Sequence, residues 1–358
     1  MLRALLFGDT HLGFDLPAHP RTQRRRRGHD FQAGFERAAA IALAEGVDVV
    51  IHGGDVFDRP DPRPALVDAA FAPLWRLAEA GIDVVVVAGN HERGSLPRPL
   101  ASAHPRLHVV DGPSLISLKI QGLRVAIGAF PYQRRVRESV EACVAGTGLL
   151  TAPADVRLLL VHHAVEGVAV GAGDHRADLA GRRPPARDFV FTRNPDVIAG
   201  SQIPGSVAAV VSGHIHRHQI IEQDLAGRPL AAPVVYAGSV ERTSPAEAPE
   251  QKLCLELALA PGAAGGRLAG VRRHPLPARP MLRQVIEGAT PAARRQAAED
   301  ALARAPADAV LQLDVDGPGL DAAWLRAVLP PAMNVDVSQR PASGSWARRR
   351  GVNAPESP

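Results

Sequence analysis

Five short runs of mostly apolar residues recur along this 358-residue chain, and most of their members are β-branched residues or leucine. The runs occupy residues 2–7, 47–52, 82–88, 156–161 and 207–211. Continuous apolar runs of this length are typical of strands that are buried on both faces, whereas a half-exposed strand alternates between apolar and polar positions. The pattern therefore predicts β-strands in sheets that are covered by helices.

Two stretches with helical spacing of apolar residues separate the first three runs. In the first stretch, Asp30 is expected to cap the start of a helix and Gly46 to follow its end. The second stretch covers residues 65–80, where Pro73 predicts a kink or a break. Strands and helices that alternate in this order predict an α/β fold.

The composition changes towards Pro, Gly, Ala and Arg at residues 260–280, which predicts a linker. A compact α/β unit is expected after it, with strands at residues 281–286, 309–315 and 333–337 and helices at 290–303 and 320–329. Thr290 and Pro291 form a favourable N-cap and first-turn pair for the first of these helices. The predicted domains are a large domain at residues 1–265, a capping domain at 275–340 and a disordered tail at 341–358.

A polar cluster follows each of the five apolar runs directly. Open α/β sheets collect their ligand-binding residues beyond the carboxyl ends of the strands, so the five clusters are expected to meet. Asp9 with His11, and His214 with His216, are two residues apart, and in an extended segment this spacing points both side chains to one side. The clusters are GDTHLG at 8–13, GGDVFD at 53–58, GNHE at 89–92, VHH at 161–163 and GHIH at 213–216.

Asp55, Asn90 and His162 complete a set of seven candidate metal ligands that offers oxygen and nitrogen but no sulfur. His162 is preferred to His163 because it follows the strand directly and alternation turns its neighbour the other way. Such a set suits two closely spaced divalent ions that share Asp55, with Mn²⁺ favoured by the oxygen ligands and Fe or Zn as alternatives. Two metals held in this way predict hydrolysis at a phosphorus centre.

Among the 41 basic residues only Lys119 and Lys252 are lysine, so almost every positive charge is arginine. The formal net charge is +4 and the sequence pI is about 9.6. The codon preference of a GC-rich genome explains this bias by itself, and an acidic partner such as nucleic acid is the functional alternative. The two cysteines form no CxxC pair and fit a reducing cytoplasm. The first run is too short for a signal peptide, and none approaches the length of a membrane span.

The five clusters together resemble those of the calcineurin-like metallophosphoesterases over most of residues 1–245. That resemblance implies a four-layer α/β/β/α sandwich with two metals at one edge of its paired sheets. It also implies that His91 is not a ligand but faces the scissile phosphate, where it stabilises charge and helps the leaving oxygen to take a proton. The implied ligands of one metal are Asp9, His11, Asp55 and His216, and those of the other are Asp55, Asn90, His162 and His214.

Within that family, the strings GHIHRHQ at 213–219, YAGSVERTS at 236–244 and LPARPM at 276–281 are similar to those of SbcD-type DNA repair exonucleases. This similarity implies cleavage of DNA from 3′ ends, usually with manganese, beside an SbcC-type coiled-coil ATPase. The chain departs from the family pattern at Glu92, where Asp is usual, so support of His91 by this carboxylate would have to span one more methylene. Asp58 stands where archaeal and eukaryotic relatives have His, and no clear helical pair follows Val337 to dock on a coiled coil.

Arginines near the clusters are the candidate DNA contacts. Arg25 and Arg26 belong to a run between the first cluster and the next helix that either holds a DNA backbone or is a solvated loop. Arg193 belongs to a second candidate surface, in the Pro-rich loop before the fifth cluster. The helix around residues 66–77 either packs in the core or supplies a homodimer interface.

The predicted function is therefore a dinuclear metal-dependent phosphodiesterase that hydrolyses DNA in repair, as an exonuclease and with endonuclease activity left open. One alternative is the same chemistry on a small-molecule or protein phosphoester. The other is a catalytically silent scaffold protein, and the complete ligand set together with His91 argues against it.

Overall fold

Two six-stranded β-sheets form the framework of the larger of two units in the computed structural model, which describes residues 1–15, 26–97, 104–170 and 189–340. The larger unit comprises Met1–Leu16, Gly28–Arg242 and Pro249–Ala278. The smaller unit comprises Pro17–Arg27, Thr243–Ala248 and Arg279–Pro358. The tail predicted at residues 341–358 lies outside the described residues.

The first sheet contains the first three predicted strands. Its members are, in spatial order, β16 (Arg267–Pro275), β15 (Leu253–Ala260), β1 (Leu2–Phe7), β2 (Val49–His52), β3 (Asp83–Val87) and β4 (Leu107–Val110). β1 to β4 are parallel, and β15 and β16 continue the sheet as antiparallel strands. Leu5 and Phe7 of β1 enter one core while Ala4 and Leu6 enter another. Burial on both faces explains why this run is apolar at every position except Arg3.

The second sheet contains the fourth and fifth predicted strands, β7 and β12. Its members are, in spatial order, β13 (Gln219–Gln223), β14 (Pro229–Tyr236), β12 (Ala209–Ser212), β7 (Val156–Val161), β6 (Leu123–Ala129) and β5 (Ser114–Ile120). The four central strands are parallel, and β13 and β5 are antiparallel edges. β14, whose sequence Pro233 interrupts, and β6 were not predicted.

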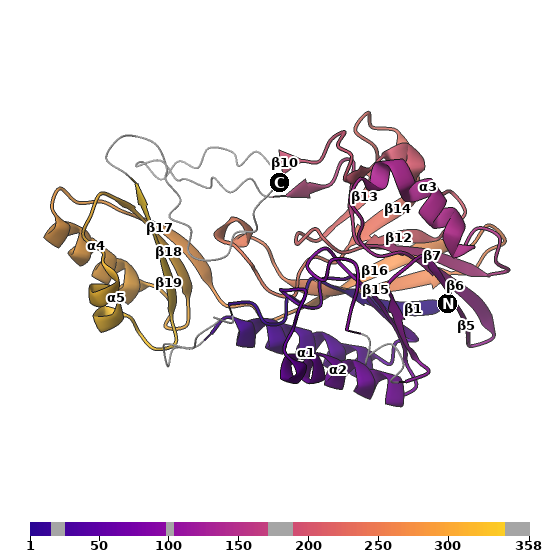
Figure 1. The fold of residues 1–358 in the computed structure, drawn as a ribbon, viewed down its shortest axis with the longest axis horizontal. Coiled ribbons are helices and arrows are strands. Elements are labelled where there is room, and N and C mark those ends of the chain that lie inside the picture. The colour runs from indigo at the N-terminus through magenta and orange to yellow at the C-terminus, as the bar shows by residue number, and fades with distance from the viewer. Residues whose placement is uncertain (16–25, 98–103, 171–188, 341–358) are drawn as a thin grey trace. The chain divides into compact units, whose positions relative to one another are not determined.

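Helices cover the outer faces of both sheets. α1 (Gly28–Glu45) and α2 (Pro64–Glu79) pack on the first sheet through residues such as Phe35 and Leu74, and α3 (Val136–Thr147) packs on the second through Val140. A further core fills the space between the sheets. Figure 1 shows α1 and α2 side by side along the first sheet, with α3 beyond the second. The predicted four-layer α/β/β/α sandwich is confirmed.

Short elements follow β7 in the larger unit. β8 (Ala164–Val165) pairs with β11 (Val197–Ile198), and β9 (Ala169–Val170) pairs with β10 (Phe189–Val190). A single 3₁₀ turn, η2, covers Gly200–Gln202. None of the helices within the described ranges is both long and apolar enough to span a bilayer.

The smaller unit contains a three-stranded parallel sheet with two helices. Its elements are η3 (Pro245–Glu247), β17 (Met281–Ile286), α4 (Pro291–Arg304), β18 (Val310–Asp316), α5 (Ala322–Val328) and β19 (Asn334–Arg340). The Thr290 hydroxyl accepts the Ala293 N–H at 3.2 Å, so the predicted N-cap is confirmed. The buried Arg279 donates to the carbonyls of Asp308 and Ala332 and thereby fixes the segment that enters β17.

Two local predictions are wrong, and a third is wrong in part. α1 begins at Gly28, so Asp30 lies in its first turn instead of capping it. α2 continues through Pro73 without the predicted break, and a kink there stays a prediction. The residues expected to form a linker include β16, which pairs with β15 along Arg267–Pro275. Composition was misleading at this place because β16 is an exposed edge strand, and edge strands tolerate the glycine, arginine and proline that are common in loops.

Candidate metal centre

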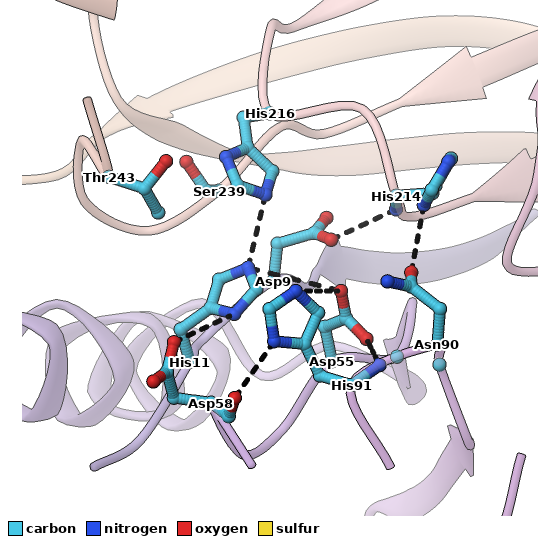
Figure 2. A network of polar contacts seen from close by, with 12 residues as sticks. Asp9, His11, Asp55, Asp58, Asn90, His91, His214, His216, Ser239 and Thr243 are labelled. Atoms are coloured by element: carbon cyan, nitrogen blue, oxygen red, sulfur yellow. Dashed lines mark hydrogen bonds and ion pairs between the residues drawn. The ribbon is translucent and has the colours of Figure 1, made fainter. Parts of the chain in front are cut away.

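The five polar clusters meet at the carboxyl edge of the two sheets, and Figure 2 shows labelled side chains of the first, second, third and fifth clusters. Three of them follow β1, β2 and β3 of the first sheet, and two follow β7 and β12 of the second. The Asp9 N–H donates to the Gly54 carbonyl at 2.9 Å, and the His11 N–H donates to the Asp55 carbonyl at 3.0 Å. The main chain therefore ties the first cluster to the second.

Glycines at the start of three clusters bring the two sheets into main-chain contact. A Cβ atom on Gly53 would lie 3.0 Å from the Gly213 nitrogen, and one on Gly213 would lie 2.3 Å from the Gly53 carbonyl oxygen. A Cβ atom on Gly8 would lie 3.1 Å from the Gly53 Cα. A Cβ atom has no room at Gly213 and would be tight at Gly53 and Gly8, so main-chain contacts contribute to the distance between the two halves of the site.

Four of the candidate ligands have a left-handed backbone. The φ angle is 49° at Asp9, 39° at His11, 51° at Asp55 and 76° at His214. Side chains other than glycine adopt this region at a cost, and such residues gather at functional sites. The extended geometry expected from the two-residue spacing is therefore wrong for Asp9, His11 and His214. Tight turns direct these side chains into the cluster.

Asp9, His11 and His216 form a first group, in which one ligand atom of each lies within 4.8 Å of the others. The Nε2 atoms of His11 and His216 are 3.0 Å apart, a separation that suits two donors to one cation. Asp9 Oδ1 accepts the His214 N–H at 2.9 Å. Its Oδ2 is buried and has no hydrogen-bond partner among the described residues. Because a buried polar atom without a partner costs free energy, a cation at this place fits the donor set.

Asp55, Asn90, His162 and His214 form a second group. Asn90 Oδ1 lies 3.1 Å from His162 Nε2 and 2.9 Å from His214 Nδ1. Asp55 Oδ2 lies 3.3 Å from His162 Nε2 and 3.9 Å from His11 Nε2, so Asp55 joins the two groups. The structure thus brings all seven candidate ligands together in the two groups that the sequence resemblance implied. Their role in metal binding stays a prediction.

His162 points into the cluster and His163 does not. His162 Nδ1 donates to the Gly53 carbonyl at 2.7 Å, so Nε2 carries the free electron pair when the ring is neutral. The His163 ring stacks on Tyr132, with ring centroids 5.1 Å apart. Tyr132, which also lies beside the His214 ring, was missed from the sequence because β6, the strand that carries it to the site, was not recognised.

His52 connects the first two clusters through hydrogen bonds, although it belongs to none of the five clusters. Its Nδ1 accepts the Gly54 N–H at 3.2 Å, and its Nε2 is 3.1 Å from the Thr10 hydroxyl. That hydroxyl donates to the Val56 carbonyl at 3.0 Å. Burial lowers the pKa of His52 to about 3, so the ring is neutral. The only sequence signal was its place at the end of β2.

Asp55 and His162 form a buried ion pair. Burial alone would lower the pKa of His162, but the charge of Asp55 and their hydrogen bond outweigh it and raise this pKa to about 9. Burial would raise the pKa of Asp55, and His162 in turn holds it well below the usual value. Burial also raises the pKa of Asp9 and lowers that of His214 to about 3. A proton on His162 therefore competes with any cation for Nε2.

His91 lies at the rim of the cluster. Its side chain is 34% exposed, against 2% for those of His11 and Asp55, so a substrate can reach it. His91 Nδ1 donates to the Asp58 carbonyl at 2.9 Å, and Nε2 is 3.9 Å from Asp55 Oδ2. The carbonyl fixes the ring so that Nε2 is the atom able to exchange a proton at the cluster.

Glu92 supports the main chain of two clusters. Its two oxygens accept the N–H groups of Phe57 and Gly89, each at 2.7 Å. Burial, with a contribution from the charge of Asp55, raises the pKa of Glu92 to about 8. The support of His91 that was considered for this carboxylate is supplied by the Asp58 carbonyl instead.

The structure places two of the three arginines chosen from the sequence. Arg26 is half-buried in the smaller unit, and Arg193 is exposed between β10 and β11. Arg25 lies outside the described residues. The role of Arg25, Arg26 and Arg193 in DNA binding stays a prediction.

Paired sheets with this set of carboxylate, amide and imidazole groups at one edge define a metallophosphoesterase. The calcineurin-like phosphoesterase family matches residues 2–218, and the chain belongs to this family. Members of the family use divalent metals, and the two groups of candidate ligands described above are consistent with that chemistry.

The similar proteins are named as DNA double-strand break repair proteins or as a nuclease subunit. The DNA double-strand break repair protein Mre11 of Archaeoglobus fulgidus is 28% identical over 252 residues, which are 65% of this chain and 49% of the relative. The SbcD subunit of nuclease SbcCD from Bacillus subtilis is 26% identical over 260 residues, 66% of this chain and 64% of the relative. The Mre11 protein of Haloferax volcanii is 43% identical over 94 residues, 26% of this chain and 20% of the relative. The chain therefore spans less than two thirds of each of these relatives.

Proposed function

We propose that the chain hydrolyses phosphodiester bonds of DNA in repair, with Mn²⁺ as the preferred metal. The observation that carries the proposal is the convergence of seven candidate ligands and His91 at one edge of the paired sheets. Two divalent ions held there would polarise the phosphodiester and activate a water molecule. One ion would be held by Asp9, His11, Asp55 and His216, and the other by Asp55, Asn90, His162 and His214.

His91 is the proposed catalytic side chain. Because Nδ1 is engaged by the Asp58 carbonyl, Nε2 is the atom that would donate a hydrogen bond to the phosphate and pass a proton to the leaving oxygen. The exposure of its ring at the rim is compatible with direct contact to a substrate.

DNA is favoured over a small phosphoester by the names of the relatives and by three arginines at the rim. Arg59, Arg93 and Arg134 are exposed and follow Asp58, His91 and Tyr132, respectively, by one or two residues. Within the described part of the chain, none of the three side chains forms an ion pair with a carboxylate. Guanidinium groups that are not neutralised by the protein suit the phosphates on either side of a cleaved bond.

The support for an ATPase partner comes from the names of the relatives. The Bacillus subtilis relative is named as one component of the nuclease SbcCD, which supports an SbcC-type ATPase partner. The expected lack of docking helices concerns residues after Val337, where β19 continues to Arg340 and the remainder lies outside the described residues. Assembly as a homodimer through α2 stays a prediction.

Removal of the three rim arginines is expected to weaken DNA binding and its dependence on salt. Replacing Arg59, Arg93 and Arg134 by alanine should lower affinity roughly tenfold to a hundredfold and reduce the slope of log affinity against log salt by about 2 to 3. Fluorescence anisotropy in a His91→Ala background, which keeps the DNA intact, measures both quantities.

The matched control removes the same charge elsewhere on the larger unit. Arg37, Arg76 and Arg267 are exposed; Arg76 and Arg267 lie near the opposite edge of the first sheet, close to the starts of β3 and β16. Their triple alanine variant should retain most of the affinity and salt slope. Equal slopes for the two triple variants would contradict a specific role for the rim.

Metal binding is expected to release protons. In protein stripped of metal, His162 with a pKa of about 9 and Glu92 with a pKa of about 8 are mostly protonated near neutrality. Cations require a neutral His162 and favour an ionised Glu92, so about one to two protons should leave per chain at neutral pH. Affinity for Mn²⁺ should therefore rise with pH up to about 9 and fall as pH is lowered. Calorimetry in buffers of different ionisation enthalpy counts the protons, and a buffer-independent heat would contradict the assignment.

The proposed function is tested with Mn²⁺, end-labelled double- and single-stranded DNA, and bis(4-nitrophenyl) phosphate as a small diester. Cleavage of DNA that His91→Ala abolishes is the expected result. Cleavage of the small diester without cleavage of DNA would favour the alternative substrate class. Binding of Mn²⁺ without turnover of either substrate would favour a scaffold role.

A further inference from the structure

The buried Lys252 contacts the main chain of His216, a member of the first group of candidate ligands, and has no part in the chemistry proposed above. The Lys252 side chain is 1% exposed. Its Nζ donates to the His216 carbonyl at 3.0 Å, to the Ser239 hydroxyl at 2.9 Å and to Glu250 Oε2 at 2.9 Å. Burial of an ammonium group is costly unless it is paired and hydrogen-bonded. A buried lysine therefore fits a position at which several acceptors need hydrogen-bond donors held in fixed directions.

The acceptors of Lys252 connect it to a candidate ligand. His216 contributes its Nε2 to the first group, 3.0 Å from that of His11. Its carbonyl accepts two hydrogen bonds, one from Lys252 and one from the Ser239 N–H at 3.1 Å. A carbonyl that accepts two hydrogen bonds fixes the orientation of its peptide plane. The fixed plane in turn fixes the position of the His216 Cα atom, from which the imidazole side chain extends. Figure 2 shows Ser239 beside His216.

The segment that carries Ser239 is the start of the YAGSVERTS string. It follows β14, which runs parallel to β12, so both strands deliver their ends to the same edge. Gly238 has a φ of 82°, and a Cβ there would lie 2.5 Å from the His216 carbonyl oxygen. Ser239 also forms a parallel bridge with Gly8, next to Asp9. The Tyr236 hydroxyl donates to the His163 carbonyl at 2.9 Å. The segment at residues 236–239 thus contacts three of the five clusters.

We infer that Lys252 is a positioning residue that, together with the segment at residues 236–239, holds His216 in place for the first metal. If Lys252 only stabilised the fold, its ammonium group would need an acidic partner, but it would not need to donate a hydrogen bond to the carbonyl of a candidate ligand residue. Glu250 keeps the ammonium group oriented towards that carbonyl. The inference rests on the proposed function for the identity of His216 as a ligand.

Titration with Mn²⁺ of protein stripped of metal tests the inference independently of turnover. Lys252→Met keeps the length of the side chain and removes the donors. It should weaken one of two Mn²⁺ sites by about 10- to 100-fold and leave the other within about threefold, as replacement of an outer partner of a metal ligand typically does. Calorimetry resolves the two steps, and electron paramagnetic resonance should show loss of the spin-coupled pair at Mn²⁺ concentrations that saturate the wild type.

Three further variants separate positioning from stability. Glu250→Gln retains the lysine and should weaken the same site by a smaller factor, which keeps the test available if Lys252→Met does not fold. Glu256→Gln disrupts another buried charge cluster, in which Glu256 pairs with Arg3 and His274, and should lower the melting temperature without a change at either metal site. Lys119→Met removes the other lysine, which is exposed, and should change neither property.

Unchanged titration of both sites in folded Lys252→Met and Glu250→Gln would overturn the inference. A wild-type protein that binds two Mn²⁺ ions but leaves DNA intact would contradict the proposed function alone, because the metal titration would still report on Lys252. A wild-type protein that cleaves DNA, with variants that titrate normally, would contradict the inference alone.

Discussion

Replacement of Asp55 by asparagine is expected to reduce phosphodiester hydrolysis below detection and to weaken Mn²⁺ binding by roughly a hundredfold or more at both sites. Asp55 Oδ2 lies within 3.9 Å of His11 Nε2, His91 Nε2 and His162 Nε2, and the residue joins the two groups of candidate ligands. Asparagine keeps the shape but removes the charge that two cations would share. Metal analysis after dialysis, with activity assays at several Mn²⁺ concentrations, measures the effect.

Asp83→Asn is the matched control for this prediction. Asp83 is also a buried aspartate of the first sheet, but it begins β3 and pairs with Arg106 and His108 at the edge away from the clusters. Its replacement should lower stability by about 1 to 3 kcal/mol and leave Mn²⁺ binding intact. Two Mn²⁺ ions retained at wild-type affinity in Asp55→Asn would contradict the shared ligand.

His91→Ala is expected to lower kcat about 10²- to 10⁴-fold while both Mn²⁺ sites still fill. The reason is that Nε2 of the partly exposed His91 ring lies 3.9 Å from Asp55 Oδ2, whereas His91 is not one of the seven proposed ligands. Single-turnover rates on DNA separate this chemical step from binding. His108→Ala, which removes a histidine from the opposite edge, should cleave at the wild-type rate.

Loss of Mn²⁺ from His91→Ala would assign His91 to the metal and not to the phosphate. An equal fall of kcat on DNA and on bis(4-nitrophenyl) phosphate would leave stabilisation of charge as its main role. A larger fall on DNA, whose leaving oxygen is a poorer leaving group, is the result expected for proton transfer.

The sequence predicted the framework and the members of the site because both depend on local signals. Strands buried on two faces leave continuous apolar runs, and a polar residue directly after such a run stands at the sheet edge. Hence β1 and β7 were predicted to the residue, and the structure brings all seven candidate ligands together. β14 and β16 were missed because their proline, glycine and arginine content matches that of loops.

The internal supports of the site could not be predicted, because they depend on contacts between residues far apart in the chain. Lys252 precedes β15 of the first sheet and His216 follows β12 of the second, so the two residues come into contact only when the two sheets pack together. His52 acts through Thr10, and Glu92 acts through Phe57 and Gly89. Periodicity contains no information about such pairs, and the left-handed turns at Asp9 and His11 are equally invisible to it.

The glycine contacts between the two sheets limit how this centre can change over evolutionary time. Since the carbonyl oxygen of Gly53 leaves no room for a methyl group on Gly213, a mutation to alanine at Gly213 would force the sheets apart in a single large step. The methyl group at Gly213 is therefore expected to change the distance between the candidate ligands of the first sheet and those of the second. The separation of two bound ions would then depend on the main chain behind the ligands as well as on the ligands themselves.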